Sequence, residues 1–347
     1  MAQQKRLRNL AHKLKDKASV IAAALSIKRH VSSFQVHVIR ATTHALAAPP
    51  SESRIAAVLN VGHGPHQQLP RACIDALMDR LHHTRSATVA MKCLFTLHNV
   101  VVKGPFTLKD QLSYYPSYGG HNFLNLSTFR DDSDVESVEL SSWVRWYAVV
   151  LEQCLTVSRI LGYYLHSSSN NSVKEYPTQD RKSLVFGLSN ADLLYKMEGL
   201  VQFVEQVSCV PDSLHLQKNE LVYEVVRLVG EDYRSVQREI SLQVEELGNR
   251  TEEMDVGELN ELLGYLRRLE ESKEKLVLLF VNRIKNNGFW DLVEKVKIKV
   301  LAMKEEIEGK WLTVVTSTAT ELTRSTNPFL EPGQIVPVPP SSFVTVK

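Results

Sequence analysis

Hydrophobic positions recur at helical spacing along most of this chain. In the first segment they follow each other three or four residues apart, which places them on one stripe of a helix predicted over residues 5–28. The members of this stripe are Leu7, Leu10, Ala11, Leu14, Ala18, Ile21 and Leu25. The same spacing predicts helices at about 29–43, 51–61, 67–83, 86–103, 106–115, 141–166, 189–208, 214–247, 256–285 and 288–309. The best strand candidate, residues 277–281, lies inside a helical pattern, so the predicted fold class is all-α.

Polar segments interrupt the helical pattern and finally replace it. Residues 116–140 and 167–180 are rich in small polar residues and are predicted to be links. From Trp311 the helical period is lost among Thr, Ser and Pro, which predicts a disordered tail over 311–347. Helices of unequal length with short connections are typical of a superhelical solenoid, so we expect one domain of about ten helices over residues 1–310. The leucine spacing in 256–285 leaves an antiparallel coiled coil open for the C-terminal half.

Charge is distributed unevenly along the chain. It holds 41 lysines and arginines against 39 aspartates and glutamates, yet residues 1–54 hold ten basic residues and two acidic ones. A basic N-terminal part on an otherwise acidic chain indicates a polyanionic partner, either nucleic acid or an anionic phospholipid surface. Aromatic residues on which bases would stack are not interleaved with these cations, which favours the lipid. A non-enzymatic helical or coiled-coil scaffold whose basic N-terminal arm binds nucleic acid remains the alternative.

The first predicted helix combines its apolar stripe with lysines on the flanks and the opposite side, Lys13, Lys15 and Lys17 among them. One interpretation is a helix that lies in the headgroup layer of an anionic leaflet, with the stripe toward the acyl chains and the lysines toward the phosphates. The other is an ordinary packed helix with a solvated charged face. The pattern alone does not separate them, because both require one apolar and one charged face.

No arrangement of residues points to catalysis. The phosphate loop G-x-x-x-x-G-K-[ST], the G-x-S-x-G turn and the H-E-x-x-H motif are absent from the sequence. His82, His83 and His98 lack partners at metal spacing, so no enzyme, metal or cofactor is predicted. The four cysteines form no C-x-x-C pair and lie in apolar helical patterns, which favours buried, reduced thiols in a cytosolic protein. No apolar run reaches the about 18 residues that cross a membrane.

The segment RATTHALAAPPSESR, residues 40–54, allows two interpretations. Arg40 lies one helical turn before His44, and the next predicted helix begins near Ser51 with its amide groups available to an anion. The segment is therefore either a capped helix end with a connecting loop or part of an anion site.

The tripeptide Asn-Pro-Phe at residues 327–329 lies in the predicted tail. Asn-Pro favours a tight turn, and this turn presents the phenyl ring outward. Exposure of a phenylalanine in a disordered segment indicates a partner that buries it.

Four blocks of sequence, in this order, resemble the ANTH domain of clathrin-assembly adaptors, and its plant branch most closely. The first is RATTH at 40–44, followed by a proline-containing loop. The second is the helix that ends in TLHNVVVKG, where the family's pattern is matched by Lys92, Leu94, Leu97, His98 and Gly104. The third is FLNLSTFRDDSD at 123–134, and the fourth is SSWVRWYAVVLEQ at 141–153. The resemblance extends over about residues 5–310, because the long helices predicted within 189–310 also fit.

The resemblance implies an ENTH/ANTH-like superhelical solenoid that is not an enzyme. It implies binding to phosphatidylinositol 4,5-bisphosphate on the cytosolic leaflet, a role in forming clathrin-coated vesicles, and a vesicle SNARE as a further partner. It implies a cytoplasmic, peripheral membrane protein of clathrin-coated pits and vesicles, at the plasma membrane and the Golgi. In this setting the tripeptide is a ligand for an EH-domain endocytic protein. The expected lipid-binding residues are Lys13, Lys15, Lys17, Lys28, Arg29, Arg40, His44 and Arg54, and the expected EH-binding residues are Asn327, Pro328 and Phe329.

The chain departs from the lipid motif of the family. There, a basic residue is followed, after nine others, by a basic-x-basic-His cluster. Arg40 matches the first basic residue, but the cluster position contains PSESR at 50–54, which loses two lysine-type positions and gains an acid. We therefore expect this pocket to bind a headgroup more weakly, and the sequence does not specify which lipid it selects. We also expect the first helix and the Lys28–Arg29 pair to contribute a larger share of membrane binding. The tail has no acidic-hydrophobic clathrin box, so direct contact with clathrin is not expected.

Overall fold

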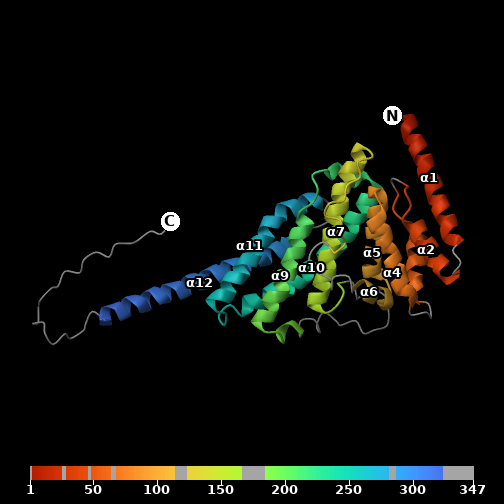
Figure 1. The fold of residues 1–347 in the computed structure, drawn as a ribbon. Helices are drawn as coiled ribbons and strands as arrows, with labels where there is room; N and C mark the ends of the chain where they lie inside the picture. The colour runs from red at the N-terminus through yellow and green to blue at the C-terminus, as the bar shows by residue number, and fades with distance from the viewer. Residues whose placement is uncertain are drawn as a thin grey trace, which may run out of the picture. The chain divides into compact units, whose positions relative to one another are not determined.

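The computed structural model of the protein describes residues 2–25, 29–45, 48–63, 68–113, 123–165, 184–280 and 287–322. All regular secondary structure in these ranges is helical, which confirms the predicted all-α class (Figure 1). The chain divides into a compact unit of residues 1–300 and a second unit of residues 301–347. The helices are α1 (Ala2–Ala24), α2 (Arg29–Ala41), α3 (Glu52–Leu59), the 3-10 helix η1 (Asn60–His63), α4 (Gln68–His83), α5 (Ala87–Lys103), α6 (Phe106–Ser113), α7 (Val135–Leu161), α9 (Asn190–Ser208), the 3-10 helix η3 (Leu214–Lys218), α10 (Glu220–Asn249), α11 (Val256–Leu279) and α12 (Asn287–Leu322).

Within the first unit, helices that follow each other in the sequence also pack against each other. α1 packs on α2, α2 on α3 and α4, and α4 on α5 and α6 (Figure 1). The stack continues from α5 to α7 and from α7 to α9, which contacts both α10 and α11. This order of neighbours is that of the predicted α-solenoid. The leucines of α11 that suggested a coiled coil are buried members of this stack, namely Leu259, Leu262, Leu266 and Leu269.

α5 lies at the centre of the stack. Every residue from Ala87 to Val101 is buried, and the helix contacts α2, α3, α4, α6, α7 and α10. Its buried polar side chains have partners, as burial requires. The His98 Nδ1 atom lies 2.8 Å from the hydroxyl of Tyr147 on α7, and its Nε2 atom lies 2.7 Å from Asp232 Oδ2 on α10, an ion-pair contact without the alignment of a hydrogen bond. One histidine thus joins three helices.

The predicted boundaries of α7 are wrong at both ends, for local reasons. The helix begins at Val135 rather than 141, because the Asp134 side chain accepts a hydrogen bond from the Ser137 amide and caps the first turn. It ends before Gly162 rather than at 166. The φ of Gly162 is 82°, a left-handed conformation that glycine adopts without steric cost. Residues 131–137 are mostly polar, so they were predicted to belong to a link although the helix begins among them.

The later helices match the predictions more closely. The helix predicted over 214–247 is divided at Asn219, whose side chain accepts from the Leu221 amide and caps α10 after η3. α11 begins as predicted, at a capping box formed by Asp255 and Glu258.

α12 extends beyond the predicted end of the last helix at 309, because it continues to Leu322. No proline lies between Trp311 and Pro328, and the β-branched residues there lower helix propensity without preventing a helix. The tripeptide at 327–329 lies outside the described residues, as do residues 116–122 of the first predicted link and the whole of the second, 167–180. The division of the chain into domains at residue 310 stays a prediction.

Three of the four cysteines are buried, unpaired thiols, as predicted. They are Cys73, Cys93 and Cys154. Burial raises the pKa of Cys73 and of Cys93 to about 12, so both are apolar, protonated core groups. Cys209 is exposed, contrary to the prediction, because it caps the C-terminal end of α9.

Candidate functional site

α1 turns its apolar stripe away from the rest of the protein. The side chains that are partly covered lie on the face of α1 toward α2, among them Asp16, Ser19, Val20 and Ala23. The large apolar side chains are exposed, with 57% for Leu10, 67% for Leu14, 58% for Ile21 and 76% for Leu25, the residue after the helix. At 100° per residue these four fall within a sector of about 60°, and we call them the α1 stripe. The face that would normally be packed is thus presented to solvent.

Cations border the α1 stripe. Lys13, Lys15 and Lys17 are all exposed. Helical spacing puts Lys13 and Lys17 on one side of the stripe and Lys15 on the other. Lys28 lies outside the described residues, and Arg29 is the first residue of α2.

A carboxylate of α1, that of Asp16, binds the loop that follows α2 and so holds α1 in this orientation. Asp16 accepts two hydrogen bonds from His44, one from the backbone N–H at 3.0 Å and one from Nδ1 at 2.6 Å. Nδ1 carries the proton, because a carboxylate only accepts. Burial lowers the pKa of His44, Asp16 opposes this effect, and Arg80 and Lys15 add to the lowering. The histidine predicted to bind a lipid headgroup therefore has an anionic partner within the chain.

Arg80 of α4 fixes the start of the same loop. Its Nε donates to Thr42 Oγ1 at 2.5 Å, and its Nη2 donates to the Thr42 carbonyl at 2.7 Å. Thr42 is fully buried and donates its own hydroxyl proton to the Val38 carbonyl at 2.6 Å. The C-terminal end of α2 is thus capped by a cation, as the helix dipole favours.

Lys92 of α5 reaches the loop from the protein interior. Its side chain is only 2% exposed, and its Nζ donates to the Ala45 carbonyl at 2.7 Å and lies 3.4 Å from Thr43 Oγ1. Burial lowers the pKa of Lys92 to about 8, while the charge of Asp16 raises it and that of Arg54 lowers it. A buried ammonium group therefore lies within electrostatic reach of α1 and of α3.

Arg40 and Arg54, the remaining predicted lipid-binding residues, are exposed on α2 and α3. The segment between them provides no further cation in its second half. Ser51 precedes α3 without a side-chain cap bond, and its Oγ lies 3.1 Å from Ser53 Oγ. Glu52 puts a negative charge in the first turn of α3, where it opposes an incoming anion. The exposed lysine and arginine side chains of segment 40–54 are thus these two arginines.

The sequence analysis assigned no function to Asp16 or Arg80. It named Lys92 only as a match to the second sequence block of the family. One signal was present: Asp16 is the single acid among the cations of residues 5–29, and it lies opposite the α1 stripe on the helical wheel. A lone acid on the polar face of a basic helix indicates a specific partner. Its partner, 28 residues away in the chain, could not be read from that signal.

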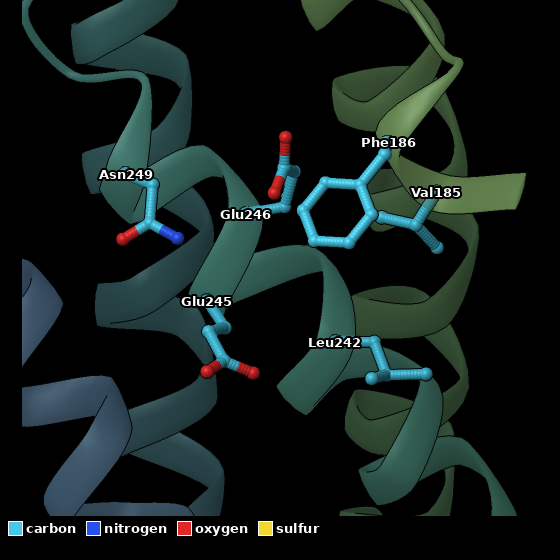
Figure 2. A pocket seen from close by; sticks show the side chains of 6 residues that line it. All are labelled: Val185, Phe186, Leu242, Glu245, Glu246 and Asn249. Carbon is cyan, nitrogen blue, oxygen red and sulfur yellow. The ribbon is translucent and has the colours of Figure 1, made fainter. Parts of the chain in front are cut away.

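A small pocket of about 60 Å³ lies beside the end of α10 (Figure 2). It is lined by Val185, Phe186, Leu242, Glu245, Glu246 and Asn249. Figure 2 shows the ring of Phe186 pointing toward Glu246, whose carboxylate is paired with Arg250 at 2.5 Å. Pockets that hold small ligands are several times larger, so this one is not assigned a ligand. In the described part of the chain there is no cluster of three metal-binding side chains, and no helix is long and apolar enough to cross a membrane.

The fold and the site together define a helical solenoid with a cationic N-terminal edge and an outward-facing amphipathic helix. The model of the ANTH domain matches residues 33–283, and the chain belongs to the ANTH domain family. The resemblance carried by the four sequence blocks is thereby confirmed. α1 lies before the first residue of this match.

Curated relatives from Arabidopsis thaliana carry names that refer to clathrin assembly. "Putative clathrin assembly protein At4g40080" is 39% identical over 295 residues, which are 83% of this chain and 80% of the relative. "Putative clathrin assembly protein At5g10410" is 30% identical over 296 residues, 82% of this chain and 83% of the relative. "Putative clathrin assembly protein At5g65370" is 28% identical over 299 residues, 82% of this chain and 96% of the relative.

Proposed function

We propose that this protein is an endocytic adaptor, without enzymatic activity, that promotes the formation of clathrin-coated vesicles. It binds phosphatidylinositol 4,5-bisphosphate on the cytosolic leaflet as a peripheral membrane protein. Membership of the ANTH domain family and the names of the relatives support the coat-related role. The membrane role is supported by α1 and by the cations around it.

The α1 stripe is the observation that carries the proposal. Four large apolar side chains on one helical face stay in water in this structure, which costs roughly 1.5 to 3 kcal/mol each relative to burial. An acyl-chain boundary would cover them, and each lysine beside them adds on the order of 1 kcal/mol near an anionic leaflet. A packed helix would have turned the same face inward.

The headgroup contact is assigned to Arg40 and Arg54, together with Lys28 and Arg29 earlier in the sequence. Guanidinium groups bind phosphate oxygens through two parallel hydrogen bonds, so two exposed arginines are a sufficient minimal contact. His44 contributes only when its bonds to Asp16 are broken. Phosphoinositide affinity should therefore depend on both the headgroup and the α1 stripe.

The tail is assigned the recruitment of an EH-domain protein through Asn327, Pro328 and Phe329. The short turn and the aromatic anchor are the features that such a partner would bury. A SNARE partner and a Golgi location have no support in residues of this chain and are not part of the proposal.

Co-sedimentation with vesicles tests the membrane role. Phosphatidylcholine vesicles with and without phosphatidylinositol 4,5-bisphosphate are compared for the wild type, for Leu14→Ser/Ile21→Ser and for the matched control Val277→Ser/Leu278→Ser. The control residues of α11 are 59% and 58% exposed, like those of the α1 stripe. We expect the α1 variant to lose more than about tenfold in vesicle affinity and the control to lose little.

Equal losses in the two double variants, or no sedimentation of the wild type at low salt, would contradict the proposal. A gel-shift with RNA and DNA at the same salt concentration separates it from nucleic-acid binding. Nucleic acid bound more tightly than the phosphoinositide vesicles would favour the alternative of a basic scaffold.

A further inference from the structure

The small pocket beside the end of α10, which we call the α10 pocket, has one apolar and one polar wall. The apolar wall consists of Val185, Phe186 and Leu242, and the polar wall of Glu245, Glu246 and Asn249 (Figure 2). Its volume of about 60 Å³ admits the end of one side chain rather than a whole small molecule. A side chain that fits between these walls needs an apolar stem and a polar tip.

Arg250, at the end of α10, holds the two walls together. Its Nη1 donates to the Leu188 carbonyl at 2.7 Å, and its Nη2 donates to the Phe186 carbonyl at 3.0 Å. The same guanidinium group pairs with Glu246 at 2.5 Å, and the Glu246 side chain is only 9% exposed. The α10 pocket is therefore held open by bonds within the chain, and the charge of Glu246 is already balanced.

Glu245 carries the charge of the α10 pocket that is not balanced. Its side chain is exposed, and within the described part of the chain it has no ion pair. It lies four residues before the last residue of α10, where the helix dipole disfavours a negative charge and favours a cation. A cation bound beside Glu245 would therefore be stabilised both by the carboxylate and by the end of the helix.

Large apolar side chains are exposed at the same place. Leu184 is 59% exposed and Phe186 is 60% exposed, and both precede α9 by only a few residues. Neighbouring exposed apolar side chains of this size are typical of protein-binding surfaces. A small hydrophilic cation would leave them in water, whereas a segment of a protein would cover them.

We propose that the α10 pocket is a docking site for an arginine side chain of a partner protein. The guanidinium group pairs with Glu245 through two parallel hydrogen bonds, and the methylene stem lies along Leu242 and the ring of Phe186. Apolar neighbours of this arginine in the partner cover Leu184. Arginine is favoured over lysine, because its planar group both stacks on an aromatic ring and binds a carboxylate at two points. The site involves neither α1 nor the headgroup contact, so it does not depend on the membrane role.

Fluorescence anisotropy of a labelled peptide, Gly-Leu-Ala-Arg-Ala-Leu-Gly, titrated with the full chain, tests the site. A second peptide with citrulline in place of arginine keeps the shape of the side chain and loses its charge, so it should bind about tenfold more weakly. Unlabelled N-acetyl-arginine amide, used as a competitor, lacks the apolar neighbours. It should bind on the order of tenfold more weakly than the arginine peptide.

Substitutions in the two walls provide a second measurement. Glu245→Gln should weaken binding of the arginine peptide about tenfold and remove the preference for arginine over citrulline. Glu274→Gln, the same change at an exposed position of α11, is the matched control and should leave both affinities unaltered. Phe186→Ala should weaken binding of the arginine peptide about fivefold, and because Phe186 is largely exposed the variant should still fold.

Several results would overturn the proposal. One is the absence of binding by the arginine peptide at about millimolar concentration, and another is equal affinity of the wild type for both peptides. A preference for arginine that persists in Glu245→Gln would place the peptide elsewhere on the protein. Spermidine that binds more tightly than the peptide would make a small polyamine the ligand. Tighter peptide binding by Arg181→Ala/Lys182→Ala, two residues outside the described ranges, would mean that the chain fills its own pocket.

Discussion

The protein contains two histidine–aspartate pairs of nearly the same length in very different surroundings. His98 and Asp232 lie 2.7 Å apart in the centre of the solenoid, with side chains that are 1% and 0% exposed. His44 and Asp16 lie 2.6 Å apart at the N-terminal edge, with side chains that are 8% and 16% exposed. The first pair joins α5 to α10, two helices of the core, whereas the second joins the peripheral α1 to a loop.

The surroundings of the two pairs suggest two different roles. The central pair is extended by the neutral hydroxyl of Tyr147, and burial together with the charge of Asp232 raises the pKa of that hydroxyl. No anion from solvent reaches such a site, so its role is to fix the positions of three helices. The edge pair lies near the charges of Arg80 and Lys15 instead, and it joins a helix that packs at the end of the stack. The same two residue types thus join core helices in one place and hold a peripheral helix to a loop in the other.

The largest effect is expected from breaking the central pair. Asp232→Ala should lower the free energy of unfolding by about 3 to 5 kcal/mol, because it leaves the buried His98 without its partner and opens a cavity. Urea denaturation followed by circular dichroism measures the loss. A loss under about 1 kcal/mol would show that the central pair is not a structural contact.

An intermediate effect is expected from pH, through the cation beside the edge pair. The pKa of Lys92 is about 8 in the folded protein and 10.5 in the unfolded chain. Between these values the unfolded chain keeps a proton that the folded protein releases, so stability rises with pH across this window, by about 3 kcal/mol in total. Below the window, both states hold the proton and the contribution is constant.

Urea unfolding of the wild type and of Lys92→Met across this pH range isolates the contribution of Lys92. The difference in unfolding free energy between them should change in favour of the wild type as the pH rises. If the unfolding free energies of the two proteins depend on pH in the same way, the pKa of Lys92 is not lowered by burial. The edge pair and the central pair would then not differ in having an uncompensated charge beside them.

The smallest effect on global stability is expected from Asp16→Ala, the same substitution applied to the edge pair. We expect the free energy of unfolding to fall by about 1 kcal/mol or less. The substitution weakens only the packing of α1 on the rest of the protein, and a peripheral helix can detach locally while the core stays folded. Hydrogen exchange should show faster exchange in α1 and unaltered protection in α5. A loss as large as that of Asp232→Ala would mean that both pairs are core contacts.

The fold could be predicted from the sequence to a large extent, because helical periodicity and end signals are local. The apolar spacing predicted helices close to α2, α4, α5 and α9, and it predicted the start of α11 at residue 256. The predictions failed where a local signal was ambiguous. Asp134 lies in a polar run that also resembles a link, and the region after Trp311 contains weak helix formers without any residue that ends a helix.

The sequence by itself determined the composition of the candidate site: an amphipathic helix with a leucine and isoleucine stripe, lysines beside it, and the segment from Arg40 to Arg54. Only the tertiary structure decided that the stripe faces solvent, that Lys92 is buried, and that Asp16 accepts two hydrogen bonds from His44. The physical reason is that periodicity defines the faces of a helix but not which face finds a partner. That choice depends on contacts between residues far apart in the chain, here Asp16 with His44 and Lys92 with Ala45.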